Sequence, residues 1–253
     1  MQTQEILFEA RDQCAVITIN RPEQRNAVNL AACAQLEDAF KRFDADPALR
    51  VAILTGAGDK AFSSGRDLKE IAALGDASMP PMPTLGETMH VSKPVIAAVN
   101  GVAIAGGWVL AQMCDLCIAA DTATFAITEP KVGRGVGWAP PMIHMIGSRL
   151  ALELMLTGKT ISAQRAYEIG FVNRIVPREE LMAAAFAMAA EIVECAPLSV
   201  VAVRRVVRHT LNMGLDAALE VGKQVCEPLY ASEDAVEGAR AFKEKRKPRW
   251  QGK

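Results

Sequence analysis

Apolar segments that end near turn residues predict buried β-strands through the first two thirds of the chain. These segments are short and rich in valine, isoleucine and alanine, and glycine or proline follows most of them within three residues. The predicted strands cover residues 14–19, 51–55, 95–99, 116–120 and 171–176. A helix is predicted over residues 29–44, where apolar residues recur at positions 30, 33, 36, 40 and 43. Strands that alternate with helices indicate an α/β fold with a site at the strand ends.

The last third of the chain has a different pattern. From residue 179 onward the apolar positions have helical spacing, with breaks at Pro197, Gly214 and near Ser232. Because these helices carry apolar faces, they must pack on the α/β body or on another subunit. We therefore divide the chain into an α/β core, residues 1–195, and a C-terminal helical region, residues 196–253.

One stretch rich in proline and glycine, residues 75–88, is predicted to be a surface loop or lid. An uncharged stretch, residues 94–114, is long enough to cross a bilayer, but polar and glycine residues interrupt it. A buried strand, turn and helix explain it better, so no membrane span is expected. The N-terminus lacks the basic and apolar segments of a signal peptide, which predicts a cytoplasmic protein.

Composition and charge remove several classes of protein. The chain has 253 residues, 51% of them hydrophobic, so it can bury a core without disulfides or a structural metal. Its 28 Lys and Arg residues balance 29 Asp and Glu residues, which gives no overall attraction to nucleic acid. Cys114 and Cys117 have the spacing of redox and zinc sites, but no second pair or nearby histidine completes a metal set, and we expect buried structural thiols.

Glycine clusters first suggest a nucleotide site. Residues 101–107 have the gap of a phosphate-binding loop, but Trp108 and Val109 stand where lysine and serine or threonine are needed. Residues 133–137 are one residue too short for the dinucleotide fingerprint. The segment around Ser64 lacks the nucleophile elbow of serine hydrolases. These observations argue against kinase-like, dehydrogenase-like and serine hydrolase activities.

Two glycine turns remain as candidates for a catalytic site. They lie in residues 61–68 and 101–107, each after a predicted strand. Peptide N–H groups from such turns can point into one pocket and stabilise an oxyanion. Two tight turns without a site would give the same pattern, so the residues alone leave both interpretations open.

Four segments, in order along the chain, together resemble the crotonase superfamily, the enoyl-CoA hydratase/isomerase family. They are residues 20–28, 61–68, 93–107 and 237–246. The resemblance implies a spiral of ββα units with a C-terminal helical region used in trimerisation, trimers often pairing as hexamers. It also implies an acyl-CoA thioester as substrate. No metal or redox cofactor is implied, since coenzyme A enters as part of the substrate.

The resemblance also implies roles for particular residues. The thioester carbonyl would be polarised by the peptide N–H groups of Arg66 and Gly106. The positions that match coenzyme A contacts are Arg25, Ala27, Asp67, Leu68, Phe242 and Lys245, the last two reaching coenzyme A from a neighbouring subunit in some members. The acyl pocket is expected to involve Trp108, Val109 and Trp138, together with Met142 and the 75–88 loop, although Trp and Met also suit a core.

One position departs from the family pattern. The hydratases use two glutamates that hold one water, and the first of these corresponds to Val109, which cannot transfer a proton. The second corresponds to Glu129. Its place at the end of an apolar strand, beside Val132 and Trp138, should raise its pKa by desolvation and suit it to acid/base work. A surface glutamate before Pro130 is the alternative.

The predicted function is that of an acyl-CoA enzyme of the enoyl-CoA hydratase/isomerase type, a lyase or isomerase, with Glu129 as acid/base. One carboxylate can move a proton next to a thioester, whereas water addition would need another acid, for which Glu70 and Glu87 are candidates. A different acyl-CoA lyase or dehydratase of the same superfamily is an alternative.

A role in RNA binding or as a scaffold, with weak catalysis, is the alternative from another class. Some crotonase relatives bind RNA through basic helices. Here the basic residues lie at positions 204, 205, 208 and 209 and in the tail, residues 243–249. Coenzyme A phosphates or solvent account for the same charges, so we expect no nucleic acid partner.

Overall fold

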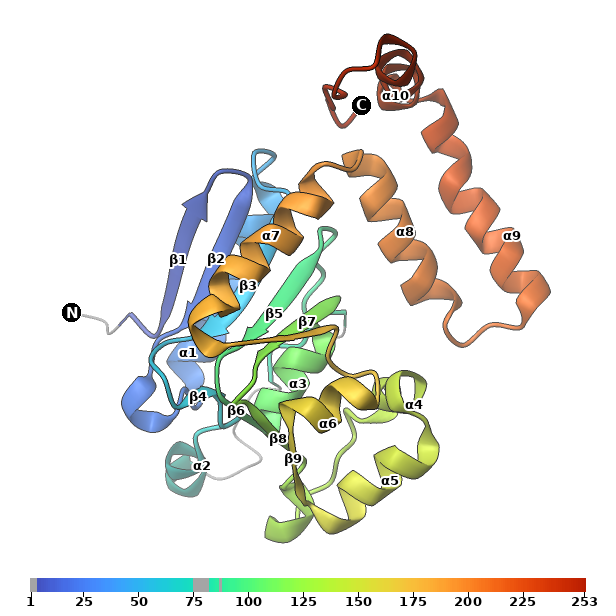
Figure 1. Ribbon diagram of the computed structural model, residues 1–253. Helices are drawn as coiled ribbons and strands as arrows, with labels where there is room; N and C mark the ends of the chain where they lie inside the picture. Colours follow the sequence, from blue (N-terminus) through green and yellow to red (C-terminus); the bar gives the residue numbers. More distant parts are fainter. Residues whose placement is uncertain (1–3, 75–81, 87) are drawn as a thin grey trace.

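A six-stranded sheet forms the centre of the core in the computed structural model, which describes residues 4–74, 82–86 and 88–253 (Figure 1). Its strand order is β1-β2-β3-β5-β7-β10, with β1 antiparallel to β2 and the other neighbours parallel. The strands are β1 (Ile6–Arg11), β2 (Cys14–Ile19), β3 (Val51–Gly56), β5 (Val95–Val99), β7 (Leu116–Ala120) and β10 (Arg174–Val176). Strands β3 and β5 are buried along their whole length, which fits their continuous apolar sequences.

A second sheet of four short strands packs beside the first. It has the order β4-β6-β8-β9, with β4 (Ala61–Ser63), β6 (Val102–Ile104), β8 (Thr124–Ala126) and β9 (Thr160–Ser162). Each of β4, β6 and β8 follows a strand of the large sheet after a short turn, and a helix or helical turn comes next along the chain. The chain therefore repeats a strand–strand–helix unit, as the family resemblance implied.

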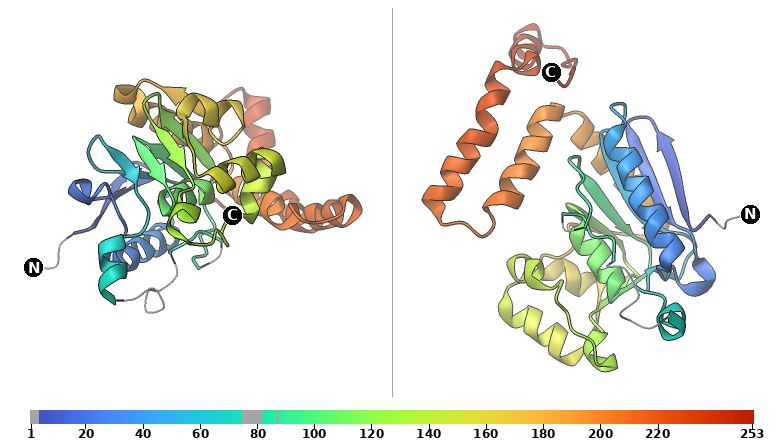
Figure 2. Two further views of the ribbon diagram at one scale, coloured as in Figure 1. Left: turned by 90° about the horizontal axis from the view of Figure 1, so that it is seen from below. Right: turned by 180° about the vertical axis from the view of Figure 1, so that it is seen from behind.

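Helices cover both faces of the large sheet. Helix α1 (Leu30–Ala45) packs on one face against β1 and β2, and α7 (Leu181–Val193) crosses the opposite face over β3, β5 and β7 (Figures 1 and 2). Helix α3 (Gly106–Met113) packs against β4, β5 and β6. The smaller helices of the core are α2 (Leu68–Leu74), α4 (Pro140–Ile146), α5 (Ser148–Thr157) and α6 (Ala163–Glu168), with the 3₁₀ turns η1 (Pro22–Gln24), η3 (Glu129–Val132) and η4 (Arg178–Glu180).

The pattern of apolar positions predicted helix α1 and most strands of the large sheet. Strands β2, β5 and β7 have the predicted bounds, and β3 is one residue longer. Helix α1 begins after Asn29, whose side chain accepts a hydrogen bond from the N–H of Ala32 at 2.8 Å. The predicted strand at 171–176 is wrong in its first half. The N–H groups of Phe171 and Val172 both bond the carbonyl of Ala166, so the chain turns there and only its last three residues form a strand.

The C-terminal helices project from the core (Figures 1 and 2). They are α8 (Pro197–Thr210), α9 (Leu215–Cys226) and α10 (Glu233–Glu244), with a 3₁₀ turn η5 (Glu227–Ala231) before the last. The three predicted breaks all lie at helix starts, because Pro197 begins α8, Gly214 precedes α9 and Ser232 caps α10. The division at residues 195 and 196 stays a prediction.

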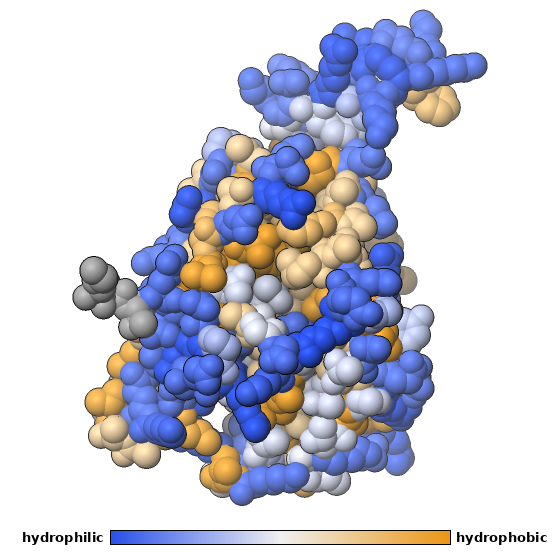
Figure 3. All heavy atoms as spheres, turned by 60° about the vertical axis from the view of Figure 1, so that its left-hand side comes forward, coloured by the Kyte–Doolittle hydropathy of each residue, from blue (hydrophilic) through white to orange (hydrophobic). Residues whose placement is uncertain are grey.

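Large apolar side chains lie exposed along this projecting region. Those on α8, α9 and the segment between them are Val203, Val207, Leu211, Met213, Leu215 and Leu219. Figure 3 also shows hydrophobic residues gathered on the surface below the mostly hydrophilic projection at the top of the view.

Within the described ranges no single helix is long and apolar enough to cross a membrane. Only the segments Arg178–Val193 and Pro197–Thr210 together reach that length, across a bend of 105°.

Candidate active site

The two predicted glycine turns meet at the ends of β4 and β6. A Cβ atom built on Gly65 would lie 2.6 Å from the backbone nitrogen of Gly106, and one built on Gly106 would lie 3.4 Å from the backbone nitrogen of Arg66. Gly65 also has a φ of +84°, a conformation that residues with a side chain rarely adopt. The absence of side chains at these two positions therefore lets the Arg66 and Gly106 peptide groups approach each other.

Hydrogen bonds fix the direction of the Arg66 peptide group. The N–H of Val28 bonds the carbonyl of Gly65 at 2.7 Å, and the N–H of Asp67 bonds the carbonyl of Val28 at 3.1 Å. Because successive N–H groups alternate in direction along an extended segment, the N–H of Arg66 points away from Val28. Ser63 supports the turn from inside, since its hydroxyl accepts from the N–H of Gly65 at 3.1 Å and donates to the carbonyl of Asn26 at 2.8 Å.

The second peptide group lies at the start of a helix. Gly106 is the first residue of α3, so its N–H has no partner within the helix and lies at the positive end of the helix dipole. The preceding residue, Ala105, has a φ of 51° and a ψ of −121°, which is strained for a residue other than glycine. The N–H of Ala105 bonds the carbonyl of Ala126 at 3.0 Å and helps to hold this conformation. Two N–H groups held in this way suit the stabilisation of an oxyanion.

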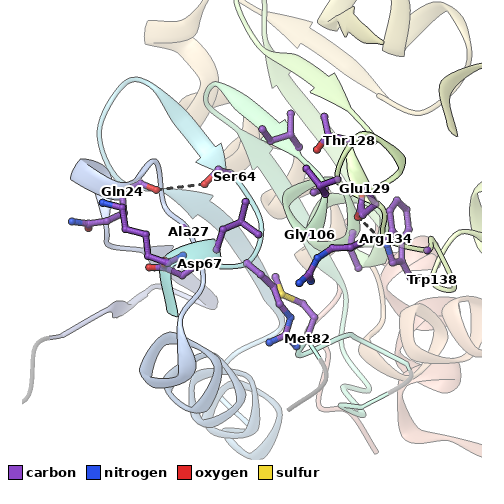
Figure 4. Close-up of a pocket in the computed structure, with 18 of the residues that line it drawn as sticks. Gln24, Ala27, Ser64, Asp67, Met82, Gly106, Thr128, Glu129, Arg134 and Trp138 are labelled. Atoms are coloured by element: carbon purple, nitrogen blue, oxygen red, sulfur yellow. Dashed lines mark hydrogen bonds between the residues drawn. The ribbon is translucent and has the colours of Figure 1, made fainter. Parts of the chain in front are cut away.

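A buried carboxylate lies across the cavity from these turns. Glu129 is the first residue of η3, which begins shortly after the end of β8, and only 9% of the residue is exposed. Its Oε1 accepts a hydrogen bond from the indole N–H of Trp138 at 3.1 Å (Figure 4). Its Oε2 is buried, and the residues that the structure describes offer it no hydrogen-bond partner. One carboxylate oxygen is thus held by a hydrogen bond, and the other has none from the described residues.

Burial raises the pKa of Glu129 above its ordinary value. Hydrogen bonds from its own backbone N–H, from Trp138 and from the backbone of Thr128 act in the opposite direction, as does the charge of Arg134. The net shift is upward, so desolvation outweighs these contacts. A carboxyl group whose pKa moves toward neutrality can both accept and return a proton, as general acid/base catalysis requires.

The turns and the carboxylate line one cavity of about 860 Å³. Figure 4 shows Gly106 and Glu129 facing this space from separate elements, with Met82 at its edge. Of the coenzyme A and acyl positions that the family resemblance indicated, its wall holds Ala27, Asp67, Leu68, Val109 and Trp138. The described lining residues are Glu23, Gln24, Ala27, Ser64, Arg66, Asp67, Leu68, Lys69, Met82, Thr84, Ile104, Ala105, Gly106, Val109, Thr128, Glu129, Val132, Gly133, Arg134, Gly135 and Trp138.

Three residues expected near coenzyme A do not line this cavity. Arg25 lies beside it and acts through its backbone, because its carbonyl accepts the N–H of Ser64 at 3.0 Å. Phe242 is 88% exposed on α10, and Lys245 follows at the end of the same helix. Helix α10 lies at the far end of the projecting region (Figure 1), so these two residues cannot reach the cavity of their own chain.

Trp108 does not line the acyl pocket, which corrects the expectation from the sequence. Its side chain is fully buried, and its ring packs against Phe125 and Phe171 at centroid distances of 5.9 and 4.4 Å. Met142 is likewise fully buried and absent from the cavity wall. Both residues therefore belong to the core. Val109, on the next position of α3, does line the cavity.

Glu70, one of the two proposed replacements for the acid missing at Val109, is not among the described lining residues. Glu70 accepts a hydrogen bond from the N–H of Leu30 at 2.8 Å, which places its carboxylate at the start of α1. Glu87 lies outside the described residues, as do residues 75–81 of the predicted lid. The acids among the described lining residues are Glu23, Asp67 and Glu129. Asp67 is ion-paired with Arg21 at 2.9 Å, so its carboxylate is already engaged.

Several of the basic residues considered for RNA binding have acidic partners within the chain. Arg204 bonds the carboxylate of Asp115 at 2.8 Å, and Arg208 bonds it at 3.1 Å. Arg246 of the tail bonds Glu237 at 2.6 Å. These contacts tie α8 and the tail to neighbouring elements, so the geometry lends the RNA-binding alternative no support.

Sequence reasoning missed Arg134 as a site residue. It lies in the wall of the cavity, and its N–H bonds the carbonyl of Glu129 at 2.9 Å. The available signal was an arginine between two glycines shortly after the expected base. The pattern of that glycine cluster was interpreted only as a nucleotide motif.

Among the described residues, no group of three or more His, Cys, Asp or Glu side chains is arranged to hold a metal ion.

Comparison with known proteins identifies relatives along nearly the whole chain. The profile of the enoyl-CoA hydratase/isomerase family matches residues 9–253. Carnitinyl-CoA dehydratase from Escherichia coli is 38% identical over 247 residues, covering 94% of this chain and 94% of that protein. The carnitinyl-CoA dehydratase from Salmonella typhi has the same identity and coverage.

Solved structures give the same relationship. The enoyl-CoA hydratase of Mycobacterium marinum superposes with a TM-score of 0.91 at 39% identity, covering 99% of this chain and 100% of that one. The enoyl-CoA hydratase of Mycobacterium tuberculosis has a TM-score of 0.91 at 38% identity, with the same coverage.

Proposed function

Because the chain belongs to the enoyl-CoA hydratase/isomerase family, we propose that it transfers a proton on an acyl-CoA thioester, with Glu129 as the acid/base. The N–H groups of Arg66 and Gly106 would hold the thioester oxygen. The observation that carries this proposal is the buried Glu129, whose Oε2 has no partner among the described residues, in the wall of the same cavity as the paired glycine turns.

The proposed reaction begins with removal of a proton from the carbon next to the thioester. The proton goes to the carboxylate of Glu129, and the electron pair of the C–H bond forms an enolate whose negative charge lies on the thioester oxygen. Two peptide N–H groups stabilise that charge, and losing one such donor typically costs about 3 kcal/mol of transition-state stabilisation. The protonated Glu129 then returns the proton elsewhere on the acyl group.

Where the proton is returned decides the product. Delivery to the γ carbon of the dienolate that forms from a 3-enoyl thioester moves the double bond to the 2 position, which is isomerisation. Delivery to a departing β-hydroxyl group releases water, which is dehydration, and the reverse reaction is hydration. Val109 supplies no second carboxylate, so we favour isomerisation, in which one base serves both steps. Dehydration is the second candidate, because two relatives at 38% identity are carnitinyl-CoA dehydratases.

The outer part of the cavity would hold coenzyme A. Ala27, Asp67 and Leu68 lie in its wall, and Leu68 is 57% exposed, as a surface for the nucleotide requires. The proposed reaction needs neither a metal nor a redox cofactor, because the chain itself supplies the base and the oxyanion donors. Coenzyme A takes part as a portion of the substrate.

We further expect a homotrimer, or a hexamer built from two trimers. The apolar side chains exposed on α8 and α9 suit contacts between subunits, and Phe242 and Lys245 would reach coenzyme A in a neighbouring subunit. Light scattering at micromolar concentration would check this part, and a monomer would contradict it.

Mass spectrometry in heavy water tests the proposed function. The purified protein is incubated with 2-enoyl-, 3-enoyl- and 3-hydroxyacyl-CoA thioesters of several chain lengths. Deuterium uptake with migration of the double bond and no added water is the expected result. Addition or loss of water would establish the hydratase or dehydratase candidate instead. If none of these thioesters changes, the proposed function is wrong.

A further inference from the structure

A chain of hydrogen bonds joins helix α3 to the carboxylate of Glu129. The indole N–H of Trp108 donates to Oε1 of Gln112 at 3.3 Å, and Nε2 of Gln112 donates to the carbonyl of Trp138 at 3.2 Å. The indole N–H of Trp138 in turn donates to Oε1 of Glu129 at 3.1 Å (Figure 4). Helix α3 begins at Gly106, so the chain connects the helix that carries a proposed oxyanion donor with the proposed base.

The amide of Gln112 suits the middle of this chain. Gln112 is buried, with 6% of the residue exposed. Both of its partners bond in one sense only, because an indole N–H is a donor and a carbonyl oxygen is an acceptor. The amide oxygen therefore faces Trp108, and the amide nitrogen faces Trp138. An ionised carboxylate at this position cannot donate to Trp138, and an apolar side chain bonds neither partner.

Trp108 holds the other end of the chain in place. Trp108 and Gln112 are one helical turn apart on α3 and so lie on the same face of the helix. The indole of Trp108 is fully buried and packs against the rings of Phe125 and Phe171. Close packing of this kind leaves an indole little room to move. Gln112 is therefore bonded to a rigid part of the core.

The segment that carries Trp138 has little packing of its own. A Cβ atom built on Gly133, Gly135 or Gly137 would meet no other atom within 4 Å, so open space surrounds this stretch. Glycine also leaves the backbone wide conformational freedom. The bond from Gln112 ties the carbonyl of Trp138 to a helix of the core and so limits the movement of the indole.

From this geometry we infer that Gln112 is a positioning residue, which orients the carboxylate of Glu129 through Trp138. This role rests on the proposed function of Glu129 as the base and goes beyond it, because Gln112 is not among the described residues that line the cavity. Without Gln112, the indole of Trp138 would be held less firmly and would donate to Glu129 for less of the time.

A weaker bond from Trp138 changes the titration of Glu129. The hydrogen bond from Trp138 lowers the pKa of Glu129, so the loss of Gln112 should raise that pKa. The charge of Arg134 also lowers it, and the substitutions below leave Arg134 in place. The titration of Glu129 therefore reports how firmly Trp138 is held.

Fluorine NMR of protein labelled with 5-fluorotryptophan tests this link without any substrate. The chain has three tryptophans, Trp108, Trp138 and Trp250, and substitution of each by Phe assigns its signal. The Trp138 signal should titrate with Glu129, and Glu129→Gln should abolish that titration. Gln112→Met keeps the length of the side chain and loses both hydrogen bonds. In this variant the midpoint should rise by about 0.5 on the pH scale, and the Trp250 signal should stay in place.

Kinetics show whether Gln112 acts through Trp138. Gln112→Met should lower kcat about three- to tenfold and move the acid limb of kcat/KM to higher pH, while the affinity for butanoyl-CoA stays the same. When Trp138→Phe is already present, Gln112→Met should have no further effect on the acid limb, because the two residues act in one chain. The matched control is Gln164→Met, which removes an exposed glutamine bonded to Glu168 outside the cavity and should change neither quantity.

Trp138→Phe gives a second measurement if Gln112→Met fails to fold. The loss of Trp138 frees the amide of Gln112 at one end, so the fluorine signal of Trp108 should shift while that of Trp250 does not. An unchanged Trp108 signal, or a Trp138 titration that stays in place in Gln112→Met, would overturn the inference and leave the proposed function intact. Additive effects in the double variant would do the same. A shifted titration in a protein that turns over no acyl-CoA would show that Gln112 orients Glu129 but would reject the proposed function.

Discussion

The indole N–H of Trp138 donates a hydrogen bond to Oε1 of Glu129 at 3.1 Å, while Oε2 of the same carboxylate is buried with no partner among the described residues. The two oxygens therefore have different environments. The hydrogen bond from Trp138, which itself lies in the cavity wall, holds the carboxylate plane in one orientation. In the proposed mechanism Trp138 is thus a positioning residue for the base.

Replacing Trp138 by Phe should change both the rate and its pH dependence. The hydrogen bond from Trp138 lowers the pKa of Glu129, so its loss should raise that pKa further. The acid limb of the kcat/KM profile should then move to higher pH, and kcat should fall about tenfold as the carboxylate loses its orientation. The matched control is Trp250→Phe, which removes a similar bond to the carbonyl of Glu194 outside the cavity. An acid limb that stays in place would show that Trp138 does not act on the base.

Replacing Glu129 by Gln should stabilise the fold at neutral pH. A carboxyl group with a raised pKa in the folded state binds more protons there than in the unfolded chain, so its contribution to stability falls as the pH rises toward the folded pKa. Glutamine removes that dependence. Urea unfolding at about pH 5 and pH 8 should therefore show a larger gain for the variant at the higher pH. A gain that is equal at both pH values would contradict a raised pKa for Glu129.

A methyl group at Gly106 should disturb the proposed oxyanion site. The Cβ atom of Gly106→Ala would lie 3.0 Å from Cα of Gly65 and 3.4 Å from the backbone nitrogen of Arg66, so the two turns must move apart by a few tenths of an ångström. We expect kcat to fall about 100-fold, since each oxyanion donor contributes to the transition state. Gly222→Ala serves as the control, because its Cβ meets only Val206 at 3.9 Å and alanine favours a helix. Full activity in Gly106→Ala would remove this pair of N–H groups from the mechanism.

A larger side chain at Gly135 should shorten the acyl chains that the protein accepts. Gly135 lines the cavity, and a Cβ there meets nothing within 4 Å, so Gly135→Val fills space without forcing a backbone shift. The value of kcat/KM should fall about tenfold for long acyl chains, because one or more methylenes lose their place, and should change little for four-carbon chains. Gly137→Val, outside the lining residues, is the matched comparison. A uniform loss for all chain lengths would indicate damage to the fold instead.

The strands of the large sheet were predictable because they are buried on both faces. Val95–Val99 and Leu116–Ala120 are continuous apolar runs bounded by polar or turn residues. Strand β1 was missed because it lies at the edge of the sheet and carries exposed charges such as Glu9 and Arg11. The strands of the small sheet have three residues each, which is too short for a periodic pattern.

The candidate site was predictable where the backbone geometry requires glycine. Gly65 and Gly106 mark the close approach of two chain segments, and the family resemblance pointed to Glu129. Side-chain direction was not predictable in the same way. Trp108 and Val109 are adjacent on α3, and the sequence could not say which of them faces the core and which the cavity. Arg134 was missed for a similar reason, because its direction depends on the fold of a turn.

The exchange of the α-proton in heavy water tests the central claim, that Glu129 is the base, most directly. The rate of deuterium uptake by a bound acyl-CoA is measured for the protein and for Glu129→Gln, with thioester affinity measured in parallel. We expect the variant to bind the thioester with similar affinity but to exchange it about 100- to 10,000-fold more slowly, the range expected for loss of a general base. Exchange at the full rate in Glu129→Gln would show that another group removes the proton and would contradict the proposed mechanism.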